Sequence, residues 1–147
     1  MTERLTATGN SSPLLDCPTA QRIIDESAFG PWWGFQVETV GQGRARVRLP
    51  FQPHFVRPGG VLQGGCCMTL ADVAFWIALL SVTGPDDPAV TLEMKTNFLG
   101  AARGDLVCDA RVIKAGRQIV YGEAETRQNV EELVAHHTVT YLRPSTQ

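Results

Sequence analysis

Hydrophobic and polar positions along the chain form several strand-like runs and one long apolar run. Residues 44–49, RARVRL, alternate strictly between polar and apolar side chains, which is typical of a strand with one buried face. Residues 35–40 form another strand-like run just before it, and GQG joins the two. Four more strand-like runs follow, at 89–98, 105–114, 118–126 and 133–142. The separators between these four are short, so we expect antiparallel neighbours rather than crossover helices.

Residues 64–82 are mainly apolar on every side of a helix. A membrane span is one interpretation of such a run. Asp72 would then lie at the centre of the bilayer, where a carboxylate is costly, and the C-terminal flank lacks a basic anchor. A helix that is apolar all round in a globular protein is instead a core helix enclosed by other elements. We therefore predict a buried central helix and no membrane association.

The order of elements predicts the fold class. A short helix at Pro18–Ser27 precedes two strands, the buried helix and four further strands. This order indicates an α+β fold in which one curled antiparallel sheet wraps around the long helix. The length of 147 residues fits a single domain, which we place at residues 17–147, after a polar and flexible segment at residues 1–16.

Composition excludes several classes of function. The net charge of −2 and the absence of a basic cluster argue against nucleic acid as a partner. No signal peptide is recognisable, and the four cysteines form no C-x-x-C pair, so we expect reduced thiols and a cytoplasmic location. His136 and His137 are neighbours on a predicted strand and would point to opposite faces, so we predict no metal site.

Asp72 is the only formal charge between Pro58 and Pro85. Removing an unpaired carboxylate from water is costly, so this residue needs either a structural partner or a chemical role. In the structural interpretation, backbone groups or Thr69 satisfy the carboxylate. In the chemical interpretation, Asp72 acts as a base or a nucleophile.

Two glycines, Gly64 and Gly65, open the predicted central helix. The first amides of a helix lack internal acceptors, so they are ready to bind an oxyanion or a polarised carbonyl. Asp72 lies eight residues after Gly64, about 12 Å along a helix. One helix therefore cannot bring both groups to the same carbonyl, whereas two antiparallel copies in a two-fold dimer can.

A motif around these residues resembles that of a known family. Residues 57–65 read RPGGVLQGG, and CCMTLA then leads to Asp72. This is similar to the Asn-Pro-x-Gly-x-x-His-Gly-Gly motif of the hotdog-fold acyl-CoA thioesterases of the phenylacetate-degradation type, in which an Asp follows after six residues. The resemblance covers roughly residues 34–141. It departs at Arg57, where the family has Asn, and at Gln63, where the family has His.

The resemblance implies a hotdog fold and hydrolysis of a thioester to a free acid and coenzyme A. Asp72 would be the nucleophile or general base, the Gly64 amide would polarise the carbonyl, and Thr91 would orient the attacking water. Gln63 would take the place of the orienting histidine. The family also implies a homodimer with a composite active site, which can pair again into a homotetramer. No separate cofactor is implied, because coenzyme A enters as part of the substrate.

Other positions would bind the substrate. By resemblance, the turn Lys114–Arg117 lies near the nucleotide end of coenzyme A, where cations suit phosphates. Phe75 and Trp76 lie one turn beyond Asp72 and are candidates for bordering the acyl pocket. The full set of predicted substrate-binding residues is Arg57, Gly65, Phe75, Trp76, Lys114, Gly116 and Arg117.

Two other functions stay open at this point. Gln63 cannot shuttle a proton near neutral pH and Arg57 adds a charge, so a non-catalytic acyl-CoA-binding module is one alternative. The other is a hotdog hydratase or dehydratase that uses His54, because PHFVRPGGVL is similar to the signature of those enzymes. In that signature an acid stands where this chain has Gly65.

Overall fold

The computed structural model describes residues 12–145. Two α-helices, one short 3-10 helix and eight strands make up this part of the chain. In chain order they are α1 (Cys17–Asp25), β1 (Gln36–Gly41), β2 (Arg44–Leu49), the 3-10 helix (Pro53–Phe55), β3 (Val56–Arg57), β4 (Val61–Leu62), α2 (Gly64–Thr83), β5 (Val90–Phe98), β6 (Leu106–Ala115), β7 (Ile119–Gln128) and β8 (Glu132–Leu142).

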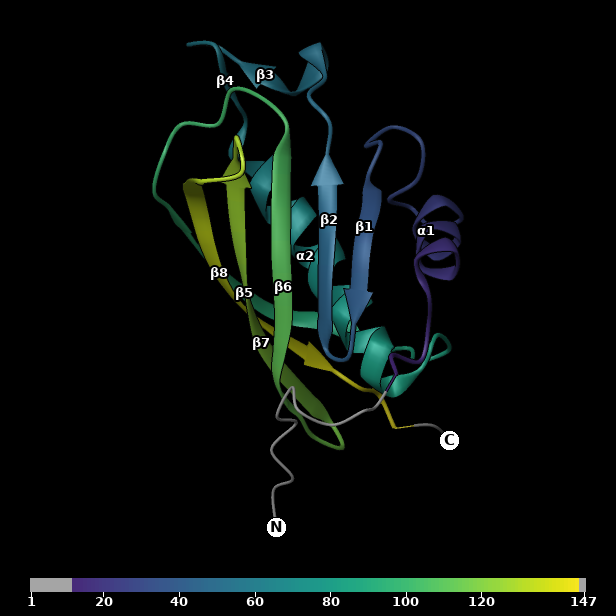
Figure 1. The fold of residues 1–147 in the computed structure, drawn as a ribbon. Helices are drawn as coiled ribbons and strands as arrows, with labels where there is room; N and C mark the ends of the chain where they lie inside the picture. The colour runs from purple at the N-terminus through teal and green to yellow at the C-terminus, as the bar shows by residue number, and fades with distance from the viewer. Residues whose placement is uncertain (1–11, 146–147) are drawn as a thin grey trace.

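Six of the strands form one antiparallel sheet in the order β1-β2-β6-β7-β8-β5. Helix α2 lies along one face of this sheet, which curls around it, and contacts all six strands (Figure 1). The two remaining strands, β3 and β4, pair with each other at one end of the molecule. This is the hotdog architecture predicted above.

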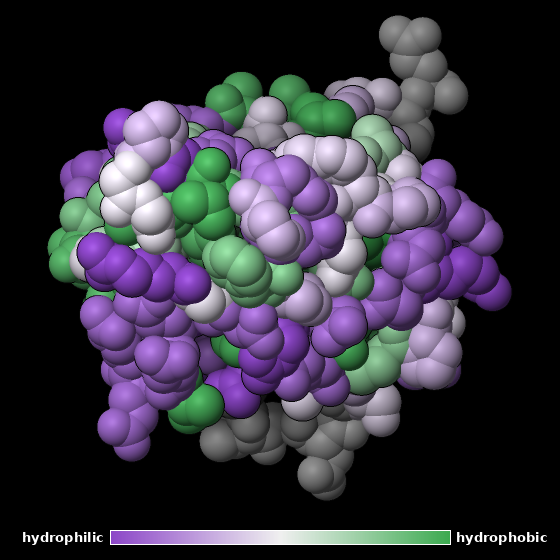
Figure 2. Space-filling view, turned by 90° about the horizontal axis from the view of Figure 1, so that it is seen from above, coloured by the Kyte–Doolittle hydropathy of each residue, from purple (hydrophilic) through white to green (hydrophobic). Residues whose placement is uncertain are grey.

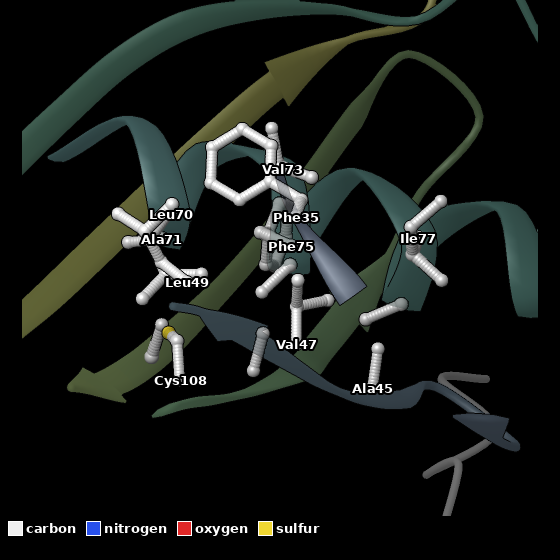
Figure 3. Packing of buried hydrophobic residues seen from close by; sticks show 14 of the residues in the cluster. Phe35, Ala45, Val47, Leu49, Leu70, Ala71, Val73, Phe75, Ile77 and Cys108 are labelled. Atoms are coloured by element: carbon white, nitrogen blue, oxygen red, sulfur yellow. The ribbon is translucent and has the colours of Figure 1, made fainter. Parts of the chain in front are cut away.

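The core forms where the apolar helix meets the inward face of the sheet. Side chains such as Val47 and Leu49 of β2 point toward Leu70, Val73 and Ile77 of α2, and all five are buried (Figure 3). The strands supply these residues by alternation, since β2 has the burial pattern exposed-buried along most of its length. By length and composition α2 is apolar enough to cross a membrane, but 67% of its most apolar window is buried inside the fold, as expected of a core helix.

Helix α1 is shorter than predicted at its C-terminal end. It begins after Asp16, whose carboxylate accepts a hydrogen bond of 2.9 Å from the amide of Thr19. It ends at Asp25 because the amide and the hydroxyl of Ser27 both bond to the carbonyl of Ile24. These bonds replace the next helical turn.

The N-terminal segment was predicted to be flexible over residues 1–16, of which residues 1–11 lie outside the described part. The end of this segment contacts α2, and its flexibility stays a prediction. The amide of Leu14 donates a hydrogen bond of 2.8 Å to the carbonyl of Ser81 in α2, and the side chain of Leu15 is buried. The chain is therefore held against the C-terminal turn of α2 from Leu14 onward.

Candidate active site

Helix α2 is not covered on all sides. Its side chains are buried along most of its length, but one narrow stripe stays partly exposed. Gly64, Met68, Asp72 and Trp76 lie in this stripe at intervals of four residues, so they share one face of the helix. Asp72 is thus at the protein surface beside an apolar helix, and not enclosed in the core.

The Asp72 carboxylate is held by two hydroxyl groups. Thr91 Oγ1 of β5 donates a hydrogen bond of 2.6 Å to Asp72 Oδ1, and Tyr141 OH of β8 donates one of 2.7 Å to the same oxygen. The Tyr141 oxygen also lies 3.1 Å from the backbone carbonyl oxygen of Asp72. Within residues 12–145, Asp72 Oδ2 has no hydrogen-bond donor. Two donors therefore orient one oxygen and leave the other available to a water or a substrate.

Tyr141 is a site residue that the sequence analysis missed. Its side chain is 4% exposed, and burial, followed by the nearby Asp72 carboxylate, raises the pKa of its hydroxyl above the ordinary value. The group is therefore a neutral donor at physiological pH. The inward alternation of β8 gives Tyr141 a buried position, but nothing local to the strand shows that Asp72, 69 residues away in sequence, lies within reach.

The start of α2 presents one free amide. Gln63 is the N-cap residue, and its side-chain oxygen accepts a hydrogen bond of 2.8 Å from the amide of Gly65. We predicted that Gly65 binds substrate, but its amide is already used in this hydrogen bond to Gln63. The amide of Gly64 has no acceptor within residues 12–145. Gln63 orients the helix start, and Gly64 is the donor left available for a ligand.

Gly64 and Asp72 are too far apart in one protomer to act on one atom. They are eight residues apart on a continuous helix, about 12 Å. A catalytic carboxylate and an oxyanion donor must both lie within about 3 Å of the reacting group. The described chain therefore carries two candidate half-sites, one at the first turn of α2 and one two turns further along.

Phe75 and Trp76 differ in where they point. Phe75 is fully buried, with its ring 5.3 Å from that of Tyr141, so it packs in the core of the protomer, and its place beside the acyl pocket stays a prediction. Phe75 precedes Trp76 by one residue, which is a rotation of about 100° around the helix. Its side chain therefore points away from the open stripe and toward the sheet. Trp76 lies on the stripe itself and packs against Phe29 at a ring distance of 6.2 Å.

The turn between β6 and β7 carries cationic side chains at the same end of the sheet as Thr91 and Tyr141, the two residues that bond to Asp72. Thr91, Tyr141, Val120 and Ala115 lie in one row across four strands, and Lys114, Gly116 and Arg117 flank the end of this row. Lys114 and Arg117 are exposed. Arg117 lines a cavity of about 690 Å³ between this turn, the loop after α2 and the C-terminal segment. Neither Asp72 nor Gly64 lines that cavity.

The end of the molecule with β3 and β4 holds the other predicted residues. Arg57 of β3 is exposed. The ring of His54 lies 4.5 Å from those of Trp32 and Phe55, so it packs among aromatic side chains. Figure 2 looks onto this end, where hydrophobic residues gather near the middle of the face and hydrophilic residues surround them. Exposed apolar side chains at this end include Trp32, Phe51 and Val56.

The cysteines of the helix start are not activated. Burial raises the pKa of the Cys66 and Cys67 thiols to about 11, and that of Cys108 to about 12. Because the thiolate is the reactive form, these residues act as small apolar side chains at neutral pH. Within the described residues, no three histidine, cysteine or acidic side chains are grouped so that they could hold a metal ion.

Comparison with known proteins places this geometry in a family. The family model described as Thioesterase superfamily matches residues 59–135, more than half of the chain and the segment that contains both half-sites. A Pseudomonas aeruginosa protein that bears an esterase name, PA0474, is 33% identical over 136 residues, which are 91% of this chain and 90% of that protein. The 1,4-dihydroxy-2-naphthoyl-CoA hydrolase of Listeria monocytogenes is 28% identical over 102 residues, or 69% of this chain and 83% of that enzyme.

Solved structures show the same fold. A conserved Pseudomonas aeruginosa protein, PA5202, is 39% identical with a TM-score of 0.76, over 80% of this chain and 94% of that one. The Escherichia coli PaaI protein of the phenylacetic acid degradation operon has a TM-score of 0.78 at 20% identity, over 90% and 99% of the two chains, and so shares the fold. The chain therefore belongs to the Thioesterase superfamily, as a thioester hydrolase of the hotdog fold.

Proposed function

We propose that this protein hydrolyses acyl-CoA thioesters as a homodimer with two composite active sites. The observation that carries the proposal is the Asp72 carboxylate, which two hydroxyl groups orient on the one open stripe of an apolar helix. Such an arrangement suits a general base or a nucleophile, because the carboxylate is fixed and still accessible. The Gly64 amide supplies the second requirement, a donor for the carbonyl oxygen.

The symmetry of the open stripe supports the second copy. Met68 lies midway between Gly64 and Asp72, points outward and is 39% exposed. If a two-fold axis passes beside Met68 and the two α2 helices pack antiparallel, Gly64 of each protomer comes to lie opposite Asp72 of the partner subunit. The same packing buries the exposed apolar stripe. A dimer thus completes two sites and covers the face that one protomer leaves open.

The proposed reaction consumes one water per thioester. The carbonyl oxygen accepts a hydrogen bond from the Gly64 amide of one protomer, which stabilises the negative charge that develops there. Asp72 of the partner subunit takes a proton from water as the water oxygen attacks the carbonyl carbon. The carbon–sulfur bond then breaks, and the thiolate of coenzyme A takes up the proton. In the nucleophilic variant, Asp72 attacks first and water hydrolyses the resulting anhydride to the same products.

Charge and shape suggest how the two ends of the substrate bind. We expect Lys114 and Arg117 to contact the phosphates of coenzyme A, with Gly116 allowing the tight turn between them. Trp76, on the open stripe beyond Asp72, is our candidate for the acyl-group wall, with Arg57 at its entrance. The name of the Listeria relative makes hydroxylated bicyclic aromatic acyl groups a substrate class to test. A cytoplasmic location fits such substrates.

The test is release of coenzyme A from a panel of aromatic and aliphatic acyl-CoAs, including 1,4-dihydroxy-2-naphthoyl-CoA. We expect wild-type turnover to fall by at least two decades in Asp72→Asn, since the amide keeps its volume but cannot accept a proton as a base. Glu26→Gln, a change of an exposed carboxylate that follows α1, is the matched control and should keep wild-type turnover. Thiol detection needs a protein-only blank because of the four cysteines.

Two outcomes would contradict the proposal. If Asp72→Asn keeps full turnover while the protein remains dimeric, another group is the base. If the wild type binds acyl-CoAs by calorimetry but releases no coenzyme A from any of them, the protein is a binding module for these ligands. In that case Arg57→Asn and Gln63→His are the changes to make first, because these positions depart from the family motif.

A further inference from the structure

The ring of Phe98 packs against Gly64, the residue whose amide is the free donor of the site. It is the last residue of β5, and its side chain is 55% exposed. The far end of its ring lies against Gly64: a Cβ atom built on Gly64 would be 3.1 Å from both Cε1 and Cζ of Phe98. Carbon atoms that are not bonded to each other prefer separations of about 3.5–4.0 Å. A side chain at residue 64 would therefore require the Phe98 ring to shift by a few tenths of an ångström.

The contact confines the Gly64 peptide from two directions. The preceding residue, Gln63, caps the helix through the amide of Gly65. The Phe98 ring closes the side of Gly64 where a side chain would otherwise project. A ring in this place also keeps water away from that side of the Gly64 amide, and a donor that exchanges fewer hydrogen bonds with water stabilises an oxyanion better.

Two contacts between α2 and β5 lie at opposite ends of the strand. Phe98 touches Gly64 at one end, and Thr91 bonds to Asp72 at the other. A two-fold axis that sets Gly64 opposite Asp72 of the partner subunit also sets Phe98 opposite Thr91 of the partner subunit. Phe98 then stands at each composite site, on the side of the amide donor.

We infer that Phe98 is a positioning residue of the proposed active site, which holds the Gly64 amide in its productive direction and shields it from water. The inference rests on the proposed function. It adds a requirement that the motif around Gly64 does not contain, because Phe98 follows it by 34 positions and belongs to an edge strand.

The experiment compares Phe98→Ala, Gly64→Ala and the double variant on the best acyl-CoA of the panel. Because Phe98 acts on the transition state through Gly64, we expect Phe98→Ala to lower kcat by about 10-fold to 100-fold and to change KM by less than about 3-fold. Gly64→Ala should lower kcat by about 100-fold or more, since its methyl group collides with the ring and displaces the donor. In the double variant the ring is gone, so adding Gly64→Ala to Phe98→Ala should lower kcat by no more than about a further 3-fold.

Leu99→Ala is the matched control, because Leu99 is the next residue and is 58% exposed. We expect it to keep wild-type kcat. Far-UV circular dichroism and molar mass in solution identify any variant that fails to fold or to associate, and Phe98→Leu, which keeps an apolar side chain, replaces Phe98→Ala if the latter does.

Three outcomes are distinguishable. Sub-additive losses with an unchanged KM support the inference. A folded, dimeric Phe98→Ala or Phe98→Leu variant with wild-type kcat, or equal losses from Gly64→Ala with and without the ring, overturns it while leaving the proposed function intact. A wild-type protein without turnover on any acyl-CoA overturns the proposed function, and the positioning role with it.

Discussion

The two edge strands of the six-stranded sheet, β1 and β5, differ in how their free sides are covered. At the β1 edge, the side chain of Gln21 from α1 makes hydrogen bonds of the kind that a neighbouring strand would make. Its oxygen accepts a hydrogen bond of 2.8 Å from the amide of Val37, and its nitrogen donates one of 2.9 Å to the carbonyl of Phe35. At the β5 edge, no described residue pairs with the free side of the strand. Val90, Leu92 and Phe98 there are 52–58% exposed.

The β1 edge is therefore covered by a side chain of the same protomer, whereas the β5 edge is open. An open edge strand with exposed apolar side chains is prone to pair with another chain, and natural proteins usually cover such edges. Here the open edge is also the one that carries Thr91 and Phe98, the two strand residues closest to Asp72 and Gly64. We interpret the open edge as the side on which a second copy completes both the sheet surface and the active site.

The largest expected effect comes from a charge at the centre of the open face. In the proposed dimer, Met68→Glu sets two carboxylates against each other beside the two-fold axis and removes apolar contact. We expect the molar mass in solution to fall from twice 16.0 kDa to the protomer value, with thioesterase activity reduced by about three decades because the partner's donor is lost.

Val130→Glu places the same charge on the exposed turn between β7 and β8 and should keep both mass and activity. Light scattering after size exclusion checks the mass. A monomeric Met68→Glu with full turnover would show that one protomer holds a complete site, contrary to our proposal.

The next effect concerns the bonds that hold the open edge strand to the sheet. His137 is buried and lies between Thr96 Oγ1 of β5 and Thr126 Oγ1 of β7, at 2.9 Å from each. Burial, with a smaller contribution from His136, lowers the pKa of His137 from 6.5 to about 4. Below pH 6.5 the unfolded chain therefore binds a proton that the folded protein does not, and the free energy of unfolding falls as the pH drops.

From pH 6.5 down to about 4 this loss amounts to about 3 kcal/mol. Urea unfolding at a series of pH values and one protein concentration measures it. His137→Gln keeps a neutral polar side chain and should show a decline that is smaller by this amount. Equal pH dependence in the two proteins would mean that other groups account for the acid sensitivity.

A smaller effect is expected at the closed edge. Gln21→Ala removes both hydrogen bonds that cover β1, and we expect the free energy of unfolding to fall by about 1–2 kcal/mol. Dimer mass and kcat should not change, since this edge lies outside the proposed interface. Gln36→Ala, an exposed residue of β1, is the control for loss of a glutamine as such. A change of oligomeric state in Gln21→Ala would contradict the contrast between the two edges.

The smallest effect is expected from one of the two donors to Asp72. Tyr141→Phe leaves Thr91 as the single donor to Asp72 Oδ1, so the carboxylate is less well oriented. Loss of one such hydrogen bond is worth about 1 kcal/mol, which corresponds to a decrease in kcat of about fivefold. Tyr121→Phe changes an exposed tyrosine of the same sheet and should be silent. A kcat equal to wild type in Tyr141→Phe would show that Thr91 alone suffices.

The sequence by itself determined the elements and singled out the acid. Alternation in residues such as 44–49 and the unbroken apolar run of α2 are local patterns, so strands and a core helix could be predicted from them. Asp72 could also be identified from the sequence, because a lone charge in an apolar segment is itself a local pattern. Gly64 followed from its place at the helix start, since helix ends always leave free amides.

Only the tertiary structure decided which groups meet these two residues. Tyr141 reaches Asp72 across 69 positions, and a shift of register between Thr91 and Glu93 sets the local course of β5 beside it. The choice of Trp76 over Phe75 for the open face depends on where the sheet leaves α2 uncovered. Phe98 became visible only as a ring in the space that a side chain on Gly64 would need. Such contacts depend on how distant strands pack around the helix, and no local pattern in the chain encodes them.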